Sequence, residues 1–153
     1  MRGDGDGWVF DADGARYWGR HGAAGLLLCA PVDGGVAVLL QHRAIWSHQG
    51  GTWGLPGGAR DSHESVEQAA VREAGEEAGI RDSDVRVVES IMTHRAPGGW
   101  SYTTVIAQAD SPVATVGNGE STELRWVPVD EVADLALHPG LAEAWPGLRP
   151  RLT

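Results

Sequence analysis

The feature that most constrains the fold of this chain is the segment 65–78, SVEQAAVREAGEEA, which carries signals for both ends of a helix. Ser65 and Gln68 form an S-x-x-Q capping box, in which each side chain can accept a hydrogen bond from the other residue's backbone N–H. Gly79 follows at the position where helices commonly end in a left-handed residue. The sequence therefore predicts one dominant helix over 65–78.

Apolar runs of strand length lie on both sides of this helix. We expect strands over 23–30, 36–42, 85–94, 102–109 and 122–127. Turns are expected at 33–35 and 96–99. After Pro128 we expect a short helix from a cap at Asp130 to about Leu137, and then a last helical turn over 141–145 before Pro146. Strands before and after one dominant helix predict an α/β fold, with a mixed β-sheet between helices.

The length of 153 residues suits a single domain. We expect an N-terminal extension or edge hairpin over 1–20, the domain proper over 21–147 and a C-terminal tail over 148–153. The Asp-Ala-Asp-Gly turn at 11–14 holds only a fragment of the acidic spacing of an EF-hand, so it does not predict a calcium loop.

The formal net charge of −9 argues against a protein that grips polymeric nucleic acid, because that task needs a basic surface. An acidic protein can still bind a phosphorylated small molecule if a divalent cation bridges the two. The single cysteine, Cys29, fits a reducing, cytoplasmic setting, and the N-terminus has no apolar leader segment. No apolar run reaches the ~18 residues of a membrane helix. We expect a phosphorylated small molecule as the partner, no polymeric nucleic acid and no membrane, and a homodimer stays open.

Three carboxylates, Glu73, Glu76 and Glu77, share one face of the expected helix. Like charges at this spacing repel by roughly 0.2–0.5 kcal/mol a pair, and the last turn of a helix disfavours anions further. A divalent cation would turn this repulsion into a binding site, because hard cations take several carboxylate oxygens. A separate stripe of small residues faces the sheet, formed by Ala70, Val71, Ala74 and Ala78.

The residues around these carboxylates follow the spacing G-x5-E-x7-R-E-U-x-E-E-x-G-U, where U is apolar. This pattern resembles the signature box of the Nudix hydrolase family at Gly58, Glu64, Arg72, Glu73, Glu76, Glu77, Gly79 and Ile80. The preceding WGLPGG at 53–58 also looks like the family's approach to the box. The resemblance implies an α/β/α sandwich of the Nudix type, in which Glu64 supports its end of the helix.

The resemblance also implies roles for the charged residues of the helix. Glu76 and Glu77 would bind Mg²⁺ or Mn²⁺ together with the backbone carbonyl of Gly57. Glu73 would be a further metal ligand or the general base for the attacking water, with Arg72 orienting it. The implied reaction is hydrolysis of the diphosphate linkage in a nucleoside diphosphate joined to another group.

A further metal ligand is expected from outside the helix, because three carboxylates and one carbonyl leave six-fold coordination incomplete unless waters fill it. Glu120 stands in a Gly-rich loop six positions before Trp126, where members of the family often carry an acidic residue. Glu123 lies within the expected strand 122–127, and we expect it to make a structural ion pair.

Candidate substrate contacts are Arg43, His48, His94 and Trp100, chosen because cations and aromatic rings suit phosphates and bases. A base stacked on Trp46, Trp53 or Trp100 would fit a nucleoside triphosphate, including an oxidised purine. ADP-ribose or another nucleotide sugar stays open as the substrate. Two other readings stay open as well: a nucleotide-sensing domain that has lost turnover, and an acidic module that binds a basic partner.

Overall fold

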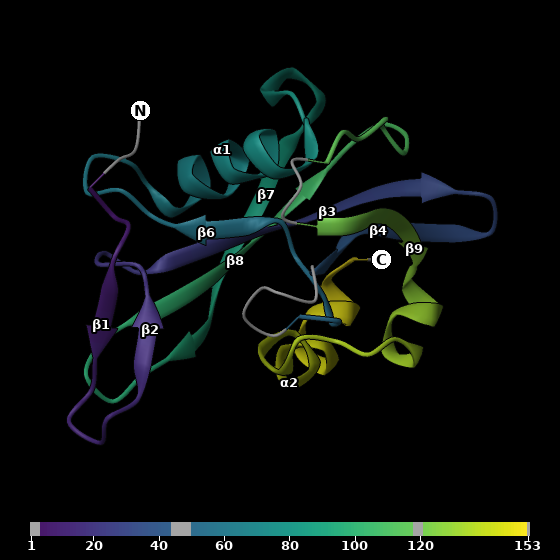
Figure 1. Ribbon diagram of the computed structural model, residues 1–153. Helices are drawn as coiled ribbons and strands as arrows, with labels where there is room; N and C mark the ends of the chain where they lie inside the picture. The colour runs from purple at the N-terminus through teal and green to yellow at the C-terminus, as the bar shows by residue number, and fades with distance from the viewer. Residues whose placement is uncertain (1–3, 44–49, 118–120, 153) are drawn as a thin grey trace.

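The computed structural model describes residues 4–43, 50–117 and 121–152, and Figure 1 shows its ribbon. The strands are β1 (Trp8–Phe10), β2 (Arg16–Trp18), β3 (Ala23–Val32), β4 (Gly35–Arg43), β5 (Trp53–Gly54), β6 (Gly57–Ala59), β7 (Arg86–Arg95), β8 (Ser101–Gln108) and β9 (Ser121–Pro128). The α-helices are α1 (Val66–Ala78) and α2 (Pro139–Leu148). Short 3₁₀ helices cover Asp82–Asp84 (η1), Val129–Asp134 (η2) and Arg149–Leu152 (η3).

Seven of these strands form one mixed sheet, whose main path runs β5-β4-β3-β8-β7. β3 pairs with β8 in parallel and with β4 in antiparallel orientation. β3 and β4 pair only near their shared turn, between Cys29–Val32 and Gly35–Val38. Beyond that point β3 pairs with β6, and β4 pairs with β5. The other edge of β4 pairs with β9. The two central strands therefore diverge, and the segment from β5 to β6 lies between them.

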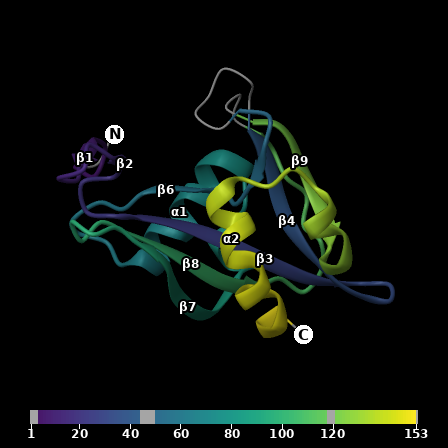
Figure 2. The same ribbon diagram turned by 90° about the horizontal axis from the view of Figure 1, so that it is seen from below.

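Helices cover both faces of this sheet, as expected for an α/β/α sandwich (Figure 2). Alternation along β3 divides the core: Leu26 and Leu28 face the cluster that contains α1, whereas Leu27 and Cys29 face the cluster that contains α2. Four fully buried alanines of α1 pack on the sheet: Ala69, Ala70, Ala74 and Ala78. Ala69 was missing from the expected stripe, and Val71 is only partly buried.

Both ends of α1 form as the sequence predicts. The Ser65 hydroxyl accepts from the Gln68 N–H at 3.1 Å, and the Gln68 side chain accepts from the Ser65 N–H at 2.8 Å. Gly79 ends the helix with φ 71°, in the left-handed region. Because these caps define where the helix begins and ends, they place Glu76 and Glu77 in its last turn.

Two predictions for the C-terminal region are wrong. Asp130 does not cap a helix: the segment after Pro128 is the 3₁₀ helix η2, without a side-chain cap. The last helix also does not stop before Pro146, which lies inside α2. Burial of Leu141, Trp145 and Leu148 on one face of α2 stabilises the helix across the proline. The packing of these side chains thus outweighs the tendency of Pro146 to end the helix.

The N-terminal residues form a hairpin of β1 and β2, a two-stranded sheet of its own with Trp8 opposite Trp18. Gly14 takes φ 88° in its turn. At the other end, Leu148 and Leu152 are buried in the α2 core cluster. Within the described residues, no helix combines the length and apolar character needed to cross a membrane.

Candidate active site

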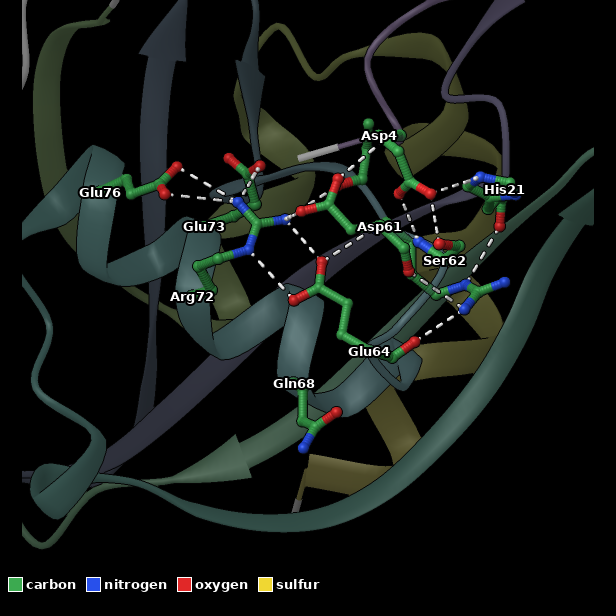
Figure 3. Close-up of polar contacts among 12 residues, drawn as sticks. Asp4, His21, Asp61, Ser62, Glu64, Gln68, Arg72, Glu73 and Glu76 are labelled. Atoms are coloured by element: carbon green, nitrogen blue, oxygen red, sulfur yellow. Dashed lines mark hydrogen bonds and ion pairs between the residues drawn. The ribbon is translucent and has the colours of Figure 1, made fainter. Parts of the chain in front are cut away.

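Arg72 of α1 is held by a buried carboxylate at the start of the helix (Figure 3). Its Nη2 and Nε donate to the two carboxylate oxygens of Glu64 at 2.7 and 3.1 Å. The backbone N–H of Asp61 donates to the same carboxylate at 2.9 Å. Burial acts to raise the pKa of Glu64, but the bonds from Arg72 outweigh it and lower that pKa. Glu64 is therefore an anchor for the guanidinium.

The opposite side of the Arg72 guanidinium faces the helix carboxylates. Nη1 donates to Glu73 at 3.0 Å and lies 3.3 Å from the exposed carboxylate of Glu76. Nη2 also donates to the carbonyl of Ala59 at 3.0 Å. The hydrogen bonds with Glu64 raise the pKa of Arg72 above its ordinary value. One permanent cation therefore stands between the anchor and two of the three helix glutamates.

Glu77, the third carboxylate, is buried at the point where β3 and β4 diverge, with 7% of its surface exposed. The Gln41 side chain of β4 donates to one oxygen at 3.0 Å, and the Gly57 N–H of β6 donates to the other at 3.1 Å. Burial, reinforced by nearby Glu73, raises the pKa of Glu77 to about 8. Two donors hold its orientation without neutralising its charge.

The partly buried Glu73 and the buried Glu77 form a pair of carboxyl groups. They lie within hydrogen-bonding reach, so protonated Glu77 can donate to Glu73. Burial raises the pKa of Glu73 too, although Arg72 acts against that rise. A divalent cation could replace the shared proton and bind both carboxylates, because its positive charge removes the repulsion between them. The residues present therefore fit a divalent metal.

Gly58 is needed because the carboxylate of Glu73 packs directly on its backbone. A Cβ at this position would lie 2.7 Å from the Glu73 Cδ. At Gly57 a Cβ would lie 2.4 Å from the carbonyl oxygen of Ala24, since β6 runs close against β3. The absence of side chains at Gly57 and Gly58 thus allows β6 to pack closely against both β3 and the carboxylate of Glu73.

A second acidic group precedes the helix. Ligand atoms of Asp61, His63 and Glu64 lie within 4.8 Å of one another, a spacing that a cation could bridge. The Arg72 guanidinium already lies 2.7 Å from Glu64 and 3.8 Å from Asp61. Arg72 compensates Glu64 and Asp61, whereas the donors to Glu77 are the neutral Gln41 side chain and the Gly57 N–H, so the site around Glu77 is better suited to a metal.

Comparison with known proteins agrees with this geometry. Residues 19–148 match the sequence model of the NUDIX domain family. The chain belongs to the Nudix hydrolase family. A Mycobacterium tuberculosis relative named "Putative 8-oxo-dGTP diphosphatase 3" is 61% identical over 97% of this chain and 71% of its own length. A Bifidobacterium longum "Nucleoside triphosphate pyrophosphatase/Nudix hydrolase fusion protein" is 45% identical over 97% of this chain and 32% of its own.

The crystal structure of the Nudix hydrolase RenU from M. smegmatis shares the fold, with a TM-score of 0.92 and 62% identity. The match covers 96% of this chain and 94% of RenU. This protein is thus a Nudix enzyme that hydrolyses phosphoric anhydride linkages in nucleotides. Nudix enzymes depend on divalent metal ions, in agreement with the carboxylate pair of α1.

The residues expected from sequence to contact the substrate do not all lie together in the structure. Trp100 stacks on Tyr17 of the hairpin at 4.7 Å and donates to the Gly19 carbonyl at 3.1 Å. The His94 ring lies 5.9 Å from the same Tyr17 ring, so both residues pack against the N-terminal hairpin. Arg43 is the last residue of β4.

Electrostatics connect Arg43 with the carboxylate site. Burial and then Glu77 raise the pKa of Tyr102, and the charge of Arg43 opposes that rise. Arg43 is therefore within electrostatic reach of the buried site. His48 and Glu120 lie outside the described residues. Glu123 pairs with Arg125 at 2.9 Å, as the sequence predicts.

Sequence reasoning missed two residues that hold charged groups of the site: Gln41 contacts Glu77, and Asp61 contacts Glu64 and Arg72. Gln41 was placed in a strand, where a polar residue after the apolar run VAVLL was the only signal. Asp61 lies within the variable positions between Gly58 and Glu64, where nothing in the spacing marks it. Both act through partners that are distant in sequence, so only the fold reveals them.

Proposed function

We propose that this Nudix enzyme hydrolyses a purine nucleoside triphosphate and prefers an oxidised purine such as 8-oxo-dGTP. The names of the M. tuberculosis and B. longum relatives support a triphosphate substrate. The observation that carries the reaction is the pair of the partly buried Glu73 and the buried Glu77 beside the guanidinium of Arg72.

In this reaction a water molecule attacks one phosphorus in line, and the new P–O bond forms as the anhydride P–O bond breaks. The water loses a proton, and the phosphate leaving group takes the bonding electrons. When bound, Mg²⁺ or Mn²⁺ neutralises phosphate oxygens and lowers the pKa of the water.

The residues that would hold the metal are Glu76, Glu77 and the Gly57 carbonyl. Glu73 completes this set or accepts the proton of the water. In either role its carboxylate must keep its direction, and Arg72 holds it at 3.0 Å. Gln41 keeps Glu77 directed towards the same place.

A substrate panel tests the proposal. We expect 8-oxo-dGTP to give a higher kcat/KM than dGTP with Mg²⁺ or Mn²⁺, and both to exceed ADP-ribose and other nucleotide sugars. Phosphate and pyrophosphate release would be measured under the same conditions. ADP-ribose turned over tenfold faster than every triphosphate would contradict the substrate class and leave the metal chemistry intact.

We also propose Glu120, which directly precedes β9 in the sequence, as a metal ligand. Its test is a comparison of Glu120→Gln with Glu123→Gln. The first should weaken activation by Mg²⁺ and lower kcat clearly more than the second, because Glu123 pairs with Arg125. Equal or reversed effects would remove Glu120 from the site.

A cytoplasmic location, which the single cysteine favours, and a homodimer stay predictions. Light scattering of the purified chain tests the second.

A further inference from the structure

The N-terminal segment before the hairpin is bound to the loop that precedes α1. The Gly5 N–H donates to Asp61 Oδ1 at 2.9 Å, and the Arg20 N–H donates to the Gly5 carbonyl at 2.7 Å. The carboxylate of Asp4 accepts from the backbone N–H of Ser62 at 2.7 Å and from its hydroxyl. Residues far apart in the chain are thereby joined beside the helix N-terminus (Figure 3).

Asp61 is the residue at which this segment meets the active site. Only 6% of its surface is exposed, and a buried carboxylate must be compensated. One of its oxygens receives the Gly5 N–H, while the other lies 3.8 Å from Arg72 Nη2. Its own backbone N–H donates to Glu64 Oε1 at 2.9 Å. Asp61 thus contacts both the arginine and the residue that anchors it.

These contacts determine where the opposite side of the guanidinium points. Because the guanidinium is planar, fixing its Nε and Nη2 also fixes Nη1. Glu64 holds the first two nitrogens, and Nη1 then meets the carboxylate of Glu73 at 3.0 Å. A shift of Asp61 would therefore reach Glu73 through Glu64 and Arg72.

We propose that Asp61 is a positioning residue for hydrolysis, and that the N-terminal segment completes the active site by holding Asp61 through the Gly5 N–H. This proposal rests on the proposed role of Arg72. Asp61 acts through Arg72 and contacts neither the reacting atoms nor the metal site. The hairpin region is then coupled to catalysis although it contributes no catalytic group.

The first experiment is Asp61→Asn, which keeps the shape of the side chain but removes its charge. We expect kcat to fall about tenfold, as for other residues that orient ligands, with KM within about threefold of wild type. Asp33→Asn is the matched control, because Asp33 is exposed in the β3–β4 turn and the same charge is removed. Its kcat should equal that of wild type.

A double-mutant cycle distinguishes positioning from general support of the fold. If Asp61 acts through Arg72, Asp61→Asn should lower kcat about tenfold in the wild-type background and less than twofold in the Arg72→Gln background. Equal factors in both backgrounds would overturn the proposal. A wild-type rate for Arg72→Gln itself would instead contradict the proposed function of the arginine.

Gly5→Ala tests the same contact from the other side and leaves Asp61 in place. Its Cβ would lie 2.1 Å from the Arg60 carbonyl oxygen and 2.9 Å from Asp61 Oδ1, so the segment must shift. We expect a loss of kcat similar to that of Asp61→Asn, and little further loss when the two are combined. Losses that simply multiply, or a Gly5→Ala enzyme with wild-type kcat, would show that the N-terminal segment does not act through Asp61.

Discussion

At the scale of a single residue, Glu77 has two opposing effects: its buried carboxylate can bind a metal, but burying that charge lowers the stability of the fold. Replacing it by Gln keeps its size and its bond from Gly57 but removes the charge that a cation needs. We expect Glu77→Gln to lower kcat by on the order of 10²-fold or more. Glu76→Gln should also reduce activity, and its carboxylate is exposed, so its effect on folding should be small.

Activity would be measured across a range of Mg²⁺ concentrations for both variants. A wild-type rate for Glu77→Gln with its best substrate would refute the proposed metal site. Glu131→Gln, at an exposed residue of η2, supplies a control for the loss of one negative charge.

Gly58 offers a second prediction at the residue scale. Its added Cβ would meet the end of the flexible Glu73 side chain at 2.7–2.9 Å, so the carboxylate moves while the backbone stays. We expect Gly58→Ala to lower kcat about tenfold or more while the melting temperature changes little. Gly35→Ala is the matched control, since nothing lies within 4 Å of its added Cβ. Unchanged kcat in Gly58→Ala would show that Glu73 tolerates displacement.

The helix α1 is the element that brings the acidic residues together, and its caps set its position. Ser65→Ala removes one half of the capping box, the bond to the Gln68 N–H. We expect a loss of about 1 kcal/mol in the free energy of unfolding, with kcat within twofold, because Glu76 and Glu77 lie in the last turn of the helix. Urea denaturation would measure the first value. A large loss of kcat with no loss of stability would contradict this division of roles.

The stability of the whole molecule should depend on pH through Glu77. Its pKa is about 8 in the folded, metal-free protein and near 4.5 when unfolded, so the folded state binds the extra proton between these values. The stability present below pH 4.5 is therefore lost as pH rises towards 8, by at most about 1.4 kcal/mol per pH unit. We expect the metal-free protein to melt at a lower temperature at pH 7.5 than at pH 5.5.

Two comparisons test whether Glu77 causes this pH dependence of stability. Glu77→Gln cannot titrate, so the metal-free variant should melt at a higher temperature than wild type at pH 7.5. A divalent cation should raise the melting temperature of wild type and affect the variant less, because it stabilises the folded state by binding. Parallel pH dependences for the two proteins would exclude Glu77 as the source.

Much of the fold follows from short-range patterns in the sequence. The capping box and Gly79 specify both ends of α1, and the apolar runs specify five strands to within about two residues, as expected from local periodicity. Packing overruled local tendency at Pro146, because burial of Trp145 and Leu148 stabilises a helix that the proline alone would end. Asp130 shows the same limit: a residue type suited to capping does not make a helix.

By itself the sequence determined that Glu73, Glu76 and Glu77 lie on one helix with the spacing of the helical repeat. Only the tertiary structure decided their environment. Gln41 meets Glu77 across 36 residues, and Gly5 meets Asp61 across 56. Such contacts depend on where β3 and β4 diverge and how the N-terminal segment packs. Helical periodicity relates residues three or four positions apart, so it cannot specify contacts that the assembled sheet creates.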